Sequence, residues 1–144
     1  MTNSVAEIED ADCIFLIGSN TTSSHPLVAT RIFRAKAKGA KLVVVDPRKI
    51  QLALNADIYV RHKLGTDVAL INGMMHAIIK NGWHDKAFVD ERCEGFEEFS
   101  NLIDSYPPER VSEITGVSAD DIVKMAEYYA KAKAGSIVYC MGIT

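Results

Sequence analysis

Two apolar runs of strand length, with a helical pattern between them, place the strongest constraint on how this chain folds. The runs are Cys13–Ile17 and Leu42–Val45, and their continuous apolar character predicts strands buried on both faces. Between them, Pro26 suits the first turn of a helix, apolar residues recur at helical spacing after it, and Gly39 ends the pattern. A strand, a helix and a second strand in this order form a crossover unit, in which the two strands are parallel.

The rest of the chain predicts two more strands and several helices. The segment "ADIYVRHK" predicts a third strand, and "SIVYCMG" predicts a fourth. Helices are predicted over Asp67–Lys80, within Trp83–Pro108, and after Ser118, where a capping box is expected and Gly135 ends the helix. The buried side of the middle segment is expected to consist of Phe88, Val89, Phe96, Phe99, Leu102 and Ile103.

These elements predict an α/β fold, a Rossmann-like three-layer sandwich with a mainly parallel sheet, and a single domain over residues 1–144. If the fourth strand lies beside the first, the strand order is 3-2-1-4. The order then reverses at the carboxyl end of the first strand, which is where open parallel sheets bind their ligands.

Three polar loops are expected to leave the carboxyl edge of this sheet. The first begins at Gly18 and carries hydroxyl and amide side chains as far as Ser24. The unpaired amides at the start of the helix that follows would favour a phosphate group. The alternative is that these residues only satisfy a turn and a helix cap.

The second and third loops carry carboxylates. Asp46 follows the second strand, where dinucleotide-binding sheets hold ribose hydroxyls, and it could equally accept from the N1–H and amino group of guanine. Arg48 could pair with a phosphate or stack on a base, and the alternative is an Asp-Pro turn beside an exposed arginine. Gly65, Thr66 and Asp67 form the third loop, for which the alternative is a simple helix cap.

Composition and motifs argue against several classes of function. A net charge of -3 gives no basic face for nucleic acid, and the apolar runs are too short to span a bilayer. The chain has neither the G-x-G-x-x-G fingerprint of NAD-binding sheets nor the G-x-x-x-x-G-K-[ST] motif of nucleotide triphosphatases. Its polar, acidic opening lacks the pattern of a signal peptide, which favours a cytoplasmic location.

No catalytic and no metal-ligating residue is predicted. Cys13, Cys93 and Cys140 are far apart and lie in apolar patterns, so we expect buried free thiols. His62 and His76 are expected to face solvent. The residues alone thus predict a nucleotide-like ligand, but they predict no reaction.

Several stretches of the chain follow one another as they do in molybdopterin oxidoreductases. They are "IGSNTTSSHPL", "VVVDPRK", "LGTDVALINGMMHAII", "KAFVDERCEGFEEF", "ITGVSADDIVKMAEYYA" and "MGIT". The "GSN…HP" and "DPR" elements are shared widely, by nitrate reductases among others. The "GTDVALINGMMHAII" and "EGFEEF" stretches most resemble the catalytic alpha subunit of formate dehydrogenases.

The resemblance implies that this segment is one internal domain of a much longer chain. Such a domain helps to bind the guanosine end of molybdopterin guanine dinucleotide, the cofactor that holds molybdenum or tungsten. The implied contacts in this chain are Gly18, Ser19, Asn20, Ser23 and Ser24 at the phosphates, Asp46 and Arg48 at the guanosine, Gly65, Thr66 and Asp67 closing over it, and Met141 and Gly142 approaching from the last strand.

For the whole protein, the resemblance implies oxidation of formate to carbon dioxide with a two-electron transfer at the metal. An iron–sulfur cluster and the metal-ligating cysteine or selenocysteine are expected elsewhere in the full-length chain. The expected partners are the rest of the catalytic subunit and electron-transfer subunits, with no nucleic acid and no membrane, and the segment alone is expected to be inactive. The alternatives are another molybdopterin oxidoreductase, such as a nitrate reductase, or a nucleotide-binding domain without a redox role.

Overall fold

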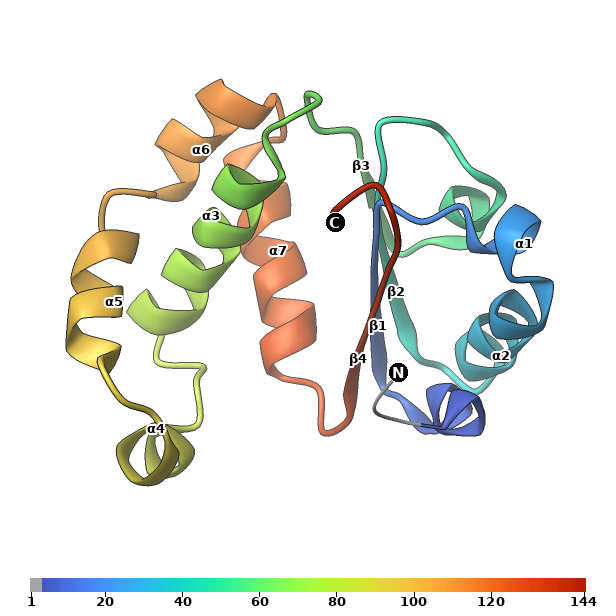
Figure 1. The fold of residues 1–144 in the computed structure, drawn as a ribbon, viewed down its shortest axis with the longest axis horizontal. Helices are drawn as coiled ribbons and strands as arrows, with labels where there is room; N and C mark the ends of the chain where they lie inside the picture. Colours follow the sequence, from blue (N-terminus) through green and yellow to red (C-terminus); the bar gives the residue numbers. More distant parts are fainter. Residues whose placement is uncertain (1–3) are drawn as a thin grey trace. The chain divides into compact units, whose positions relative to one another are not determined.

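The computed structural model describes residues 4–144 and divides the chain into two compact units (Figure 1). The first unit comprises the residues up to Arg61 together with Ala132–Thr144, and the second comprises His62–Lys131. Each unit is described by itself below. The prediction of a single domain over residues 1–144 stays a prediction.

The first unit contains a four-stranded, entirely parallel sheet. Its strands are β1 (Cys13–Ile17), β2 (Lys41–Val45), β3 (Ile58–Val60) and β4 (Gly135–Tyr139), in the order β3-β2-β1-β4. Ile17 at the end of β1 pairs with Val45 and with Tyr139, so three strands end level at the carboxyl edge. The predicted α/β fold class and strand order are confirmed.

One face of this sheet is covered by helical elements of the same unit. These are the 3-10 helix η1 (Val5–Asp10), the helix α2 (Pro26–Ala37) and the 3-10 helix η2 (Gln51–Asn55), with the short helix α1 (Thr21–Ser24) ahead of α2. The residues of this core that are at most 1% exposed include Ile14, Leu16, Ile32, Ala35, Leu42 and Val44. As predicted, α2 starts at a proline and its chain turns away at Gly39, where φ is 103°.

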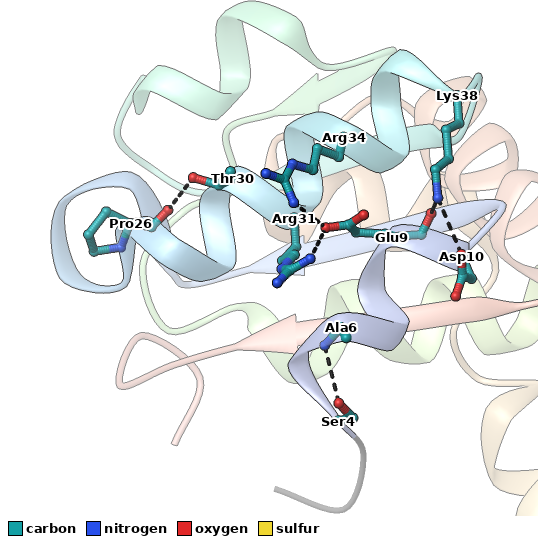
Figure 2. Close-up of polar contacts among 9 residues, drawn as sticks. All are labelled: Ser4, Ala6, Glu9, Asp10, Pro26, Thr30, Arg31, Arg34 and Lys38. Carbon is teal, nitrogen blue, oxygen red and sulfur yellow. Dashed lines mark hydrogen bonds and ion pairs between the residues drawn. The ribbon is translucent and has the colours of Figure 1, made fainter.

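Ion pairs join η1 to α2 (Figure 2). Glu9 Oε1 accepts from the guanidinium groups of both Arg31 and Arg34, the latter at 3.0 Å. Lys38 Nζ donates to the backbone carbonyl of Glu9 at 3.0 Å and lies 3.3 Å from Asp10 Oδ1. The short 3-10 helix is therefore held along α2 by charge as well as by apolar contact.

The second unit is helical. It contains α3 (Asp67–Lys80), α4 (Lys86–Arg92), α5 (Phe96–Ile103), α6 (Pro108–Thr115) and α7 (Ala119–Ala130), and α3 packs against both α6 and α7. Gly73 lets α6 approach closely, because a Cβ there would lie 2.9 Å from Val111 Cγ1. The predicted cap of α7 is confirmed, since Ser118 Oγ accepts from the Asp121 amide at 3.1 Å.

Two predictions about helices are wrong. In α4 and α5, Phe88 and Leu102 are each 57% exposed and Phe99 is 39% exposed, whereas Ile103 is buried. Helical periodicity identifies the apolar side of a helix, but it does not tell whether another element covers that side. Gly135 does not end α7, which ends at Ala130, but begins β4 instead.

The thiols also differ from expectation. Cys13 is buried, and burial raises the pKa of its thiol to about 11. Cys93 is exposed and Cys140 is partly exposed, because both follow the ends of short elements, where an apolar pattern does not guarantee cover. No helix within residues 4–144 has both the length and the apolar character needed to cross a bilayer.

Candidate functional site: the loop edge of the sheet and the start of α3

Gly18 and Gly142 meet at the carboxyl edge of the first unit. Gly18 has a φ of 59°, its amide donates to Val45 O at 3.0 Å, and its carbonyl accepts from the Gly142 amide at 3.1 Å. A Cβ on Gly18 would lie 2.8 Å from the Gly142 carbonyl carbon, and one on Gly142 would lie 2.6 Å from Gly18 O. Two residues predicted separately as cofactor contacts are thus in direct contact, and neither leaves room for a side chain.

The polar loop after Gly18 folds back on itself. The hydroxyl groups of Ser19 and Thr21 are hydrogen-bonded at 2.8 Å, and both residues are buried. The Asn20 carbonyl accepts from the amides of Ser23 and Ser24 and from the Ser24 hydroxyl. The turn hydrogen bonds expected from the simpler interpretation are therefore present.

The polar loop contains a short helix, α1, that was not predicted. α1 has four residues, and His25, with φ at -141° and ψ at 66°, separates it from α2. His25 occupies the cap position of α2, but its side chain makes no capping hydrogen bond. An anion near Ser19 or Asn20 would therefore interact with hydroxyl, amide and peptide donors rather than with the dipole of a long helix.

A cavity of about 870 Å³ lies in the first unit beside this loop. Ser19, Thr21 and His25 form part of its wall, and residues of η1, Val28 of α2 and the β4 residues Gly135–Tyr139 also line it. Met141, just beyond β4, is 82% exposed. The fourth strand is shorter than predicted, so Met141 and Gly142 belong to the loop that follows it.

Asp46 is buried and makes a turn with its own loop. Its carboxylate is 3% exposed, and Oδ1 accepts from the Arg48 amide at 2.8 Å and lies 3.6 Å from Arg48 Nε. The Arg48 side chain is 71% exposed. Oδ2 makes no hydrogen bond within the described part of the chain. One oxygen of Asp46 is therefore committed to the loop, as the simpler interpretation of an Asp-Pro turn requires.

The third loop belongs to the second unit and leads directly into α3. Gly65 has a φ of 76°, with open space where a side chain would project. The Thr66 hydroxyl donates to Lys63 O at 2.6 Å and so does not cap the helix, although Thr66 is the cap residue. The Asp67 carboxylate is 22% exposed, which makes it far more accessible than that of Asp46.

Asp67 has an unexpected partner, His62. His62 Nε2 lies 2.8 Å from Asp67 Oδ1, and the His62 side chain is 2% exposed. The prediction that His62 faces solvent is wrong, because the alternation that buries Ile58 and Val60 continues past β3 and places His62 on the same buried side. No spacing in the sequence marks this pair, since a histidine five residues before an aspartate is not a recognised motif.

Metal ligands do not gather in the described residues. Between residues 4 and 144 there is no group of three or more histidine, cysteine, aspartate and glutamate side chains that could hold a metal ion. What the site residues offer is peptide amides, hydroxyl groups and two carboxylates. This set of donors and acceptors suits a nucleotide, which has phosphate, ribose and base groups to be bound.

Comparison with known proteins gives a family and several relatives. A family model described as molybdopterin oxidoreductase matches residues 1–143. The chain is 52% identical over 144 residues to the alpha subunit of an F420-dependent formate dehydrogenase from Methanocaldococcus jannaschii, covering 100% of this chain and 21% of that protein. It is 46% identical over 144 residues to formate dehydrogenase H from Escherichia coli, covering 100% of this chain and 20% of that protein.

A solved structure shares the fold. Acetylene hydratase from Pelobacter acetylenicus superposes with a TM-score of 0.87 and 34% sequence identity, over 96% of this chain and 20% of the hydratase. The chain therefore spans about a fifth of the length of the relatives that it matches.

Proposed function

Because the chain belongs to the molybdopterin oxidoreductase family, we propose that it binds the guanosine end of molybdopterin guanine dinucleotide. The first loop of the sheet edge would contact the phosphates, and a carboxylate would recognise the base. The residues assigned to the cofactor are Gly18, Ser19, Asn20, Ser23 and Ser24 at the phosphates, Asp46 and Arg48 at the guanosine, Gly65, Thr66 and Asp67 at the third loop, and Met141 and Gly142 after β4.

The single observation that carries the proposal is the accessibility of the Asp67 carboxylate at the first turn of α3. Guanine presents N1–H and an amino group side by side, and a carboxylate can accept from both at once. Adenine presents an acceptor at N1, which would face a carboxylate that has nothing to donate. Asp46 is a weaker candidate for the base, since it is buried and Oδ1 already accepts from the Arg48 amide.

The residues present fit a phosphate-bearing nucleotide. Gly18 and Gly142 place no side chain of their own at this edge, so a ligand there could approach the peptide backbone of these two residues. Ser23 and Ser24 are exposed and add hydroxyl donors beside it. This chain's residues would bind and orient the nucleotide end of the cofactor, whose other end supplies the two-electron chemistry when a metal is bound.

For the full-length protein we propose formate oxidation to carbon dioxide. The relatives that support this are named as formate dehydrogenases and are 46% and 52% identical to the chain. A hydratase shares the fold, so the fold alone does not select the reaction. The proposal includes an iron–sulfur cluster in another part of the protein and electron-transfer subunits as partners.

The test titrates the 144-residue chain with GDP and with ADP. The NMR chemical shifts of the Gly18, Asp46 and Gly65 amides report the binding. The chain supplies only some of the cofactor contacts, so we expect binding near millimolar. GDP should bind more tightly than ADP by about ten- to a hundredfold, since an unmatched partly buried carboxylate costs roughly 1–3 kcal/mol.

Variants identify the carboxylate that recognises the base. Asp67→Asn should remove most of the preference for GDP, because an amide offers one acceptor and one donor in place of two acceptors. Asp90→Asn is the matched control, since it removes an equal charge from an exposed position on α4. Equal shifts with GDP and ADP in the unmodified chain would refute the proposal, and loss of selectivity in Asp46→Asn alone would move the base to the second loop.

A further inference from the structure

The imidazole of His62 is one feature of the second unit that packing does not explain. Its Nε2 lies 2.8 Å from Asp67 Oδ1, and because a carboxylate only accepts, Nε2 carries the hydrogen and donates. Its Nδ1 is buried and has no hydrogen-bond partner among the described residues. An apolar side chain of similar size would fill the space without leaving a polar atom unpaired, so the imidazole carries a cost in stability.

The Asp67 carboxylate is hydrogen-bonded through one oxygen, and its other oxygen is available to a ligand. The hydrogen bond from His62 uses one of the two lone pairs of Oδ1. Oδ2 makes no hydrogen bond within residues 4–144, and the side chain keeps 22% of its surface exposed. One lone pair of Oδ1 and both lone pairs of Oδ2 therefore remain for a ligand that presents two N–H groups side by side.

The rest of the third loop does not compete for this carboxylate. Thr66 directs its hydroxyl to Lys63 O, and Lys63 Nζ donates to Glu113 O at 3.1 Å. Gly65 has no side chain, and no atom lies within 4 Å of where its Cβ would be. His62 is thus the group that fixes the Asp67 carboxylate.

We propose that His62 is a positioning residue for base recognition, which donates from Nε2 to Asp67 Oδ1 and presents the carboxylate edge-on to the paired N–H groups of guanine. This role rests on the proposed function, with Asp67 as the carboxylate that recognises the base. Without His62 the carboxylate would rotate freely and would bind the two N–H groups less well.

The experiment compares His62→Leu with His62→Gln in the 144-residue chain, using GDP and ADP as probes. His62→Leu should lower the preference for GDP over ADP by about five- to tenfold, within the value of one ordinary hydrogen bond, because the carboxylate remains and loses only its orientation. His62→Gln keeps a side-chain N–H and should retain most of the preference. The melting temperature of His62→Leu should equal or exceed that of the unmodified chain, which a merely structural histidine would not allow.

The matched control is His76→Leu, which removes a second histidine whose Nδ1 is buried and has no hydrogen-bond partner among residues 4–144. His76 lies within α3, away from the helix start, so the GDP preference should not change. If the unmodified chain prefers GDP and His62→Leu keeps the full preference, the role of His62 is overturned while the proposed function stands.

If the unmodified chain binds GDP and ADP equally, the proposed function fails, and a measurement without nucleotide still decides the role of His62. Three-bond couplings report the side-chain rotamer of Asp67. We expect a single rotamer in the unmodified chain and in His62→Gln, and averaging in His62→Leu. Equal averaging in all three proteins would overturn the positioning role.

Discussion

Gly142 has no room for a side chain, although its φ lies outside the left-handed region. A methyl group there would lie 2.6 Å from Gly18 O and 2.7 Å from Gly18 Cα. Both are backbone atoms, which cannot rotate away as the end of a side chain could. The cost of a substitution at this position is therefore steric rather than conformational.

We predict that Gly142→Ala lowers the free energy of unfolding by about 1–3 kcal/mol, the usual cost of overpacking. Urea denaturation of the 144-residue chain measures it, and Met141→Ala is the neighbouring control because that side chain is 82% exposed. An effect of Gly142→Ala no larger than that of Met141→Ala would show that the two loops do not meet closely in solution.

Individual site residues could be predicted from the sequence, but their mutual contacts could not. Gly18, Asp46 and Asp67 were predicted because each follows a strand or opens a helix, which is a local pattern. The pairing of β1 with β4 follows from the predicted strand order, but the contact between Gly18 and Gly142 depends on how the loops fold beyond these strands, which no local pattern encodes. The predicted surface position of His62 is wrong, although the alternation of buried Ile58 and Val60 carries a signal for its burial.

At the scale of elements, the attachment of η1 to α2 depends on a carboxylate between two guanidinium groups. Hydrogen bonds from Arg31 and then from Arg34 lower the pKa of Glu9, and this outweighs the opposing effect of burial. A carboxyl group with a lowered pKa in the folded state stabilises that state above the unfolded pKa. The stabilisation is lost as the pH falls through the folded pKa.

We therefore predict that Glu9→Gln lowers the melting temperature at pH 7. The substitution should have little effect at pH values well below 4.5, which is the ordinary pKa of a glutamate side chain. Melting curves at several pH values provide the measurement. Asp10→Asn is the control on the same element, since Asp10 is 80% exposed and lies near a single lysine. A pH-independent difference between Glu9→Gln and the unmodified chain would show that packing, rather than charge, holds η1.

Helices and strands were predicted correctly where several sequence signals within one short segment agreed. α3 has the predicted bounds, Asp67–Lys80, because an acidic first turn, a long apolar stripe and an Asn-Gly stop all agree. The apolar sides of α4 and α5 were predicted as buried, but Phe88 and Leu102 remain exposed. Periodicity is a property of one helix, whereas burial is a property of two elements, so only the first can be deduced from a short segment.

At the scale of the molecule, the chain belongs to the molybdopterin oxidoreductase family and spans about a fifth of the length of its relatives, and its strand order could be predicted from the sequence. The reaction could not be predicted from the residues alone, because no catalytic group lies in the segment's motifs. The reaction is implied by the resemblance to a family. That family is confirmed by the molybdopterin oxidoreductase family model, which matches residues 1–143.

We predict that the isolated 144-residue chain neither reduces a dye with formate nor copurifies with stoichiometric molybdenum or tungsten. We propose that the chain contacts the nucleotide end of the cofactor, and residues 4–144 hold no cluster of histidine, cysteine, aspartate and glutamate side chains that could bind a metal ion. Elemental analysis and a dye-reduction assay measure this, with formate omitted as the control. Stoichiometric metal or formate-dependent turnover would contradict the assignment of this segment to nucleotide binding.

The pairing of β1 with β4 has a consequence for synthesis on the ribosome. β1 can pair with β2 early, but its other edge waits for β4, whose first residue, Gly135, pairs with Cys13. Until β4 emerges from the exit tunnel, β1 exposes one unpaired edge in an apolar strand, and such edges recruit other chains. Nascent chains stalled before Gly135 should therefore require a chaperone more than chains stalled well after Gly142.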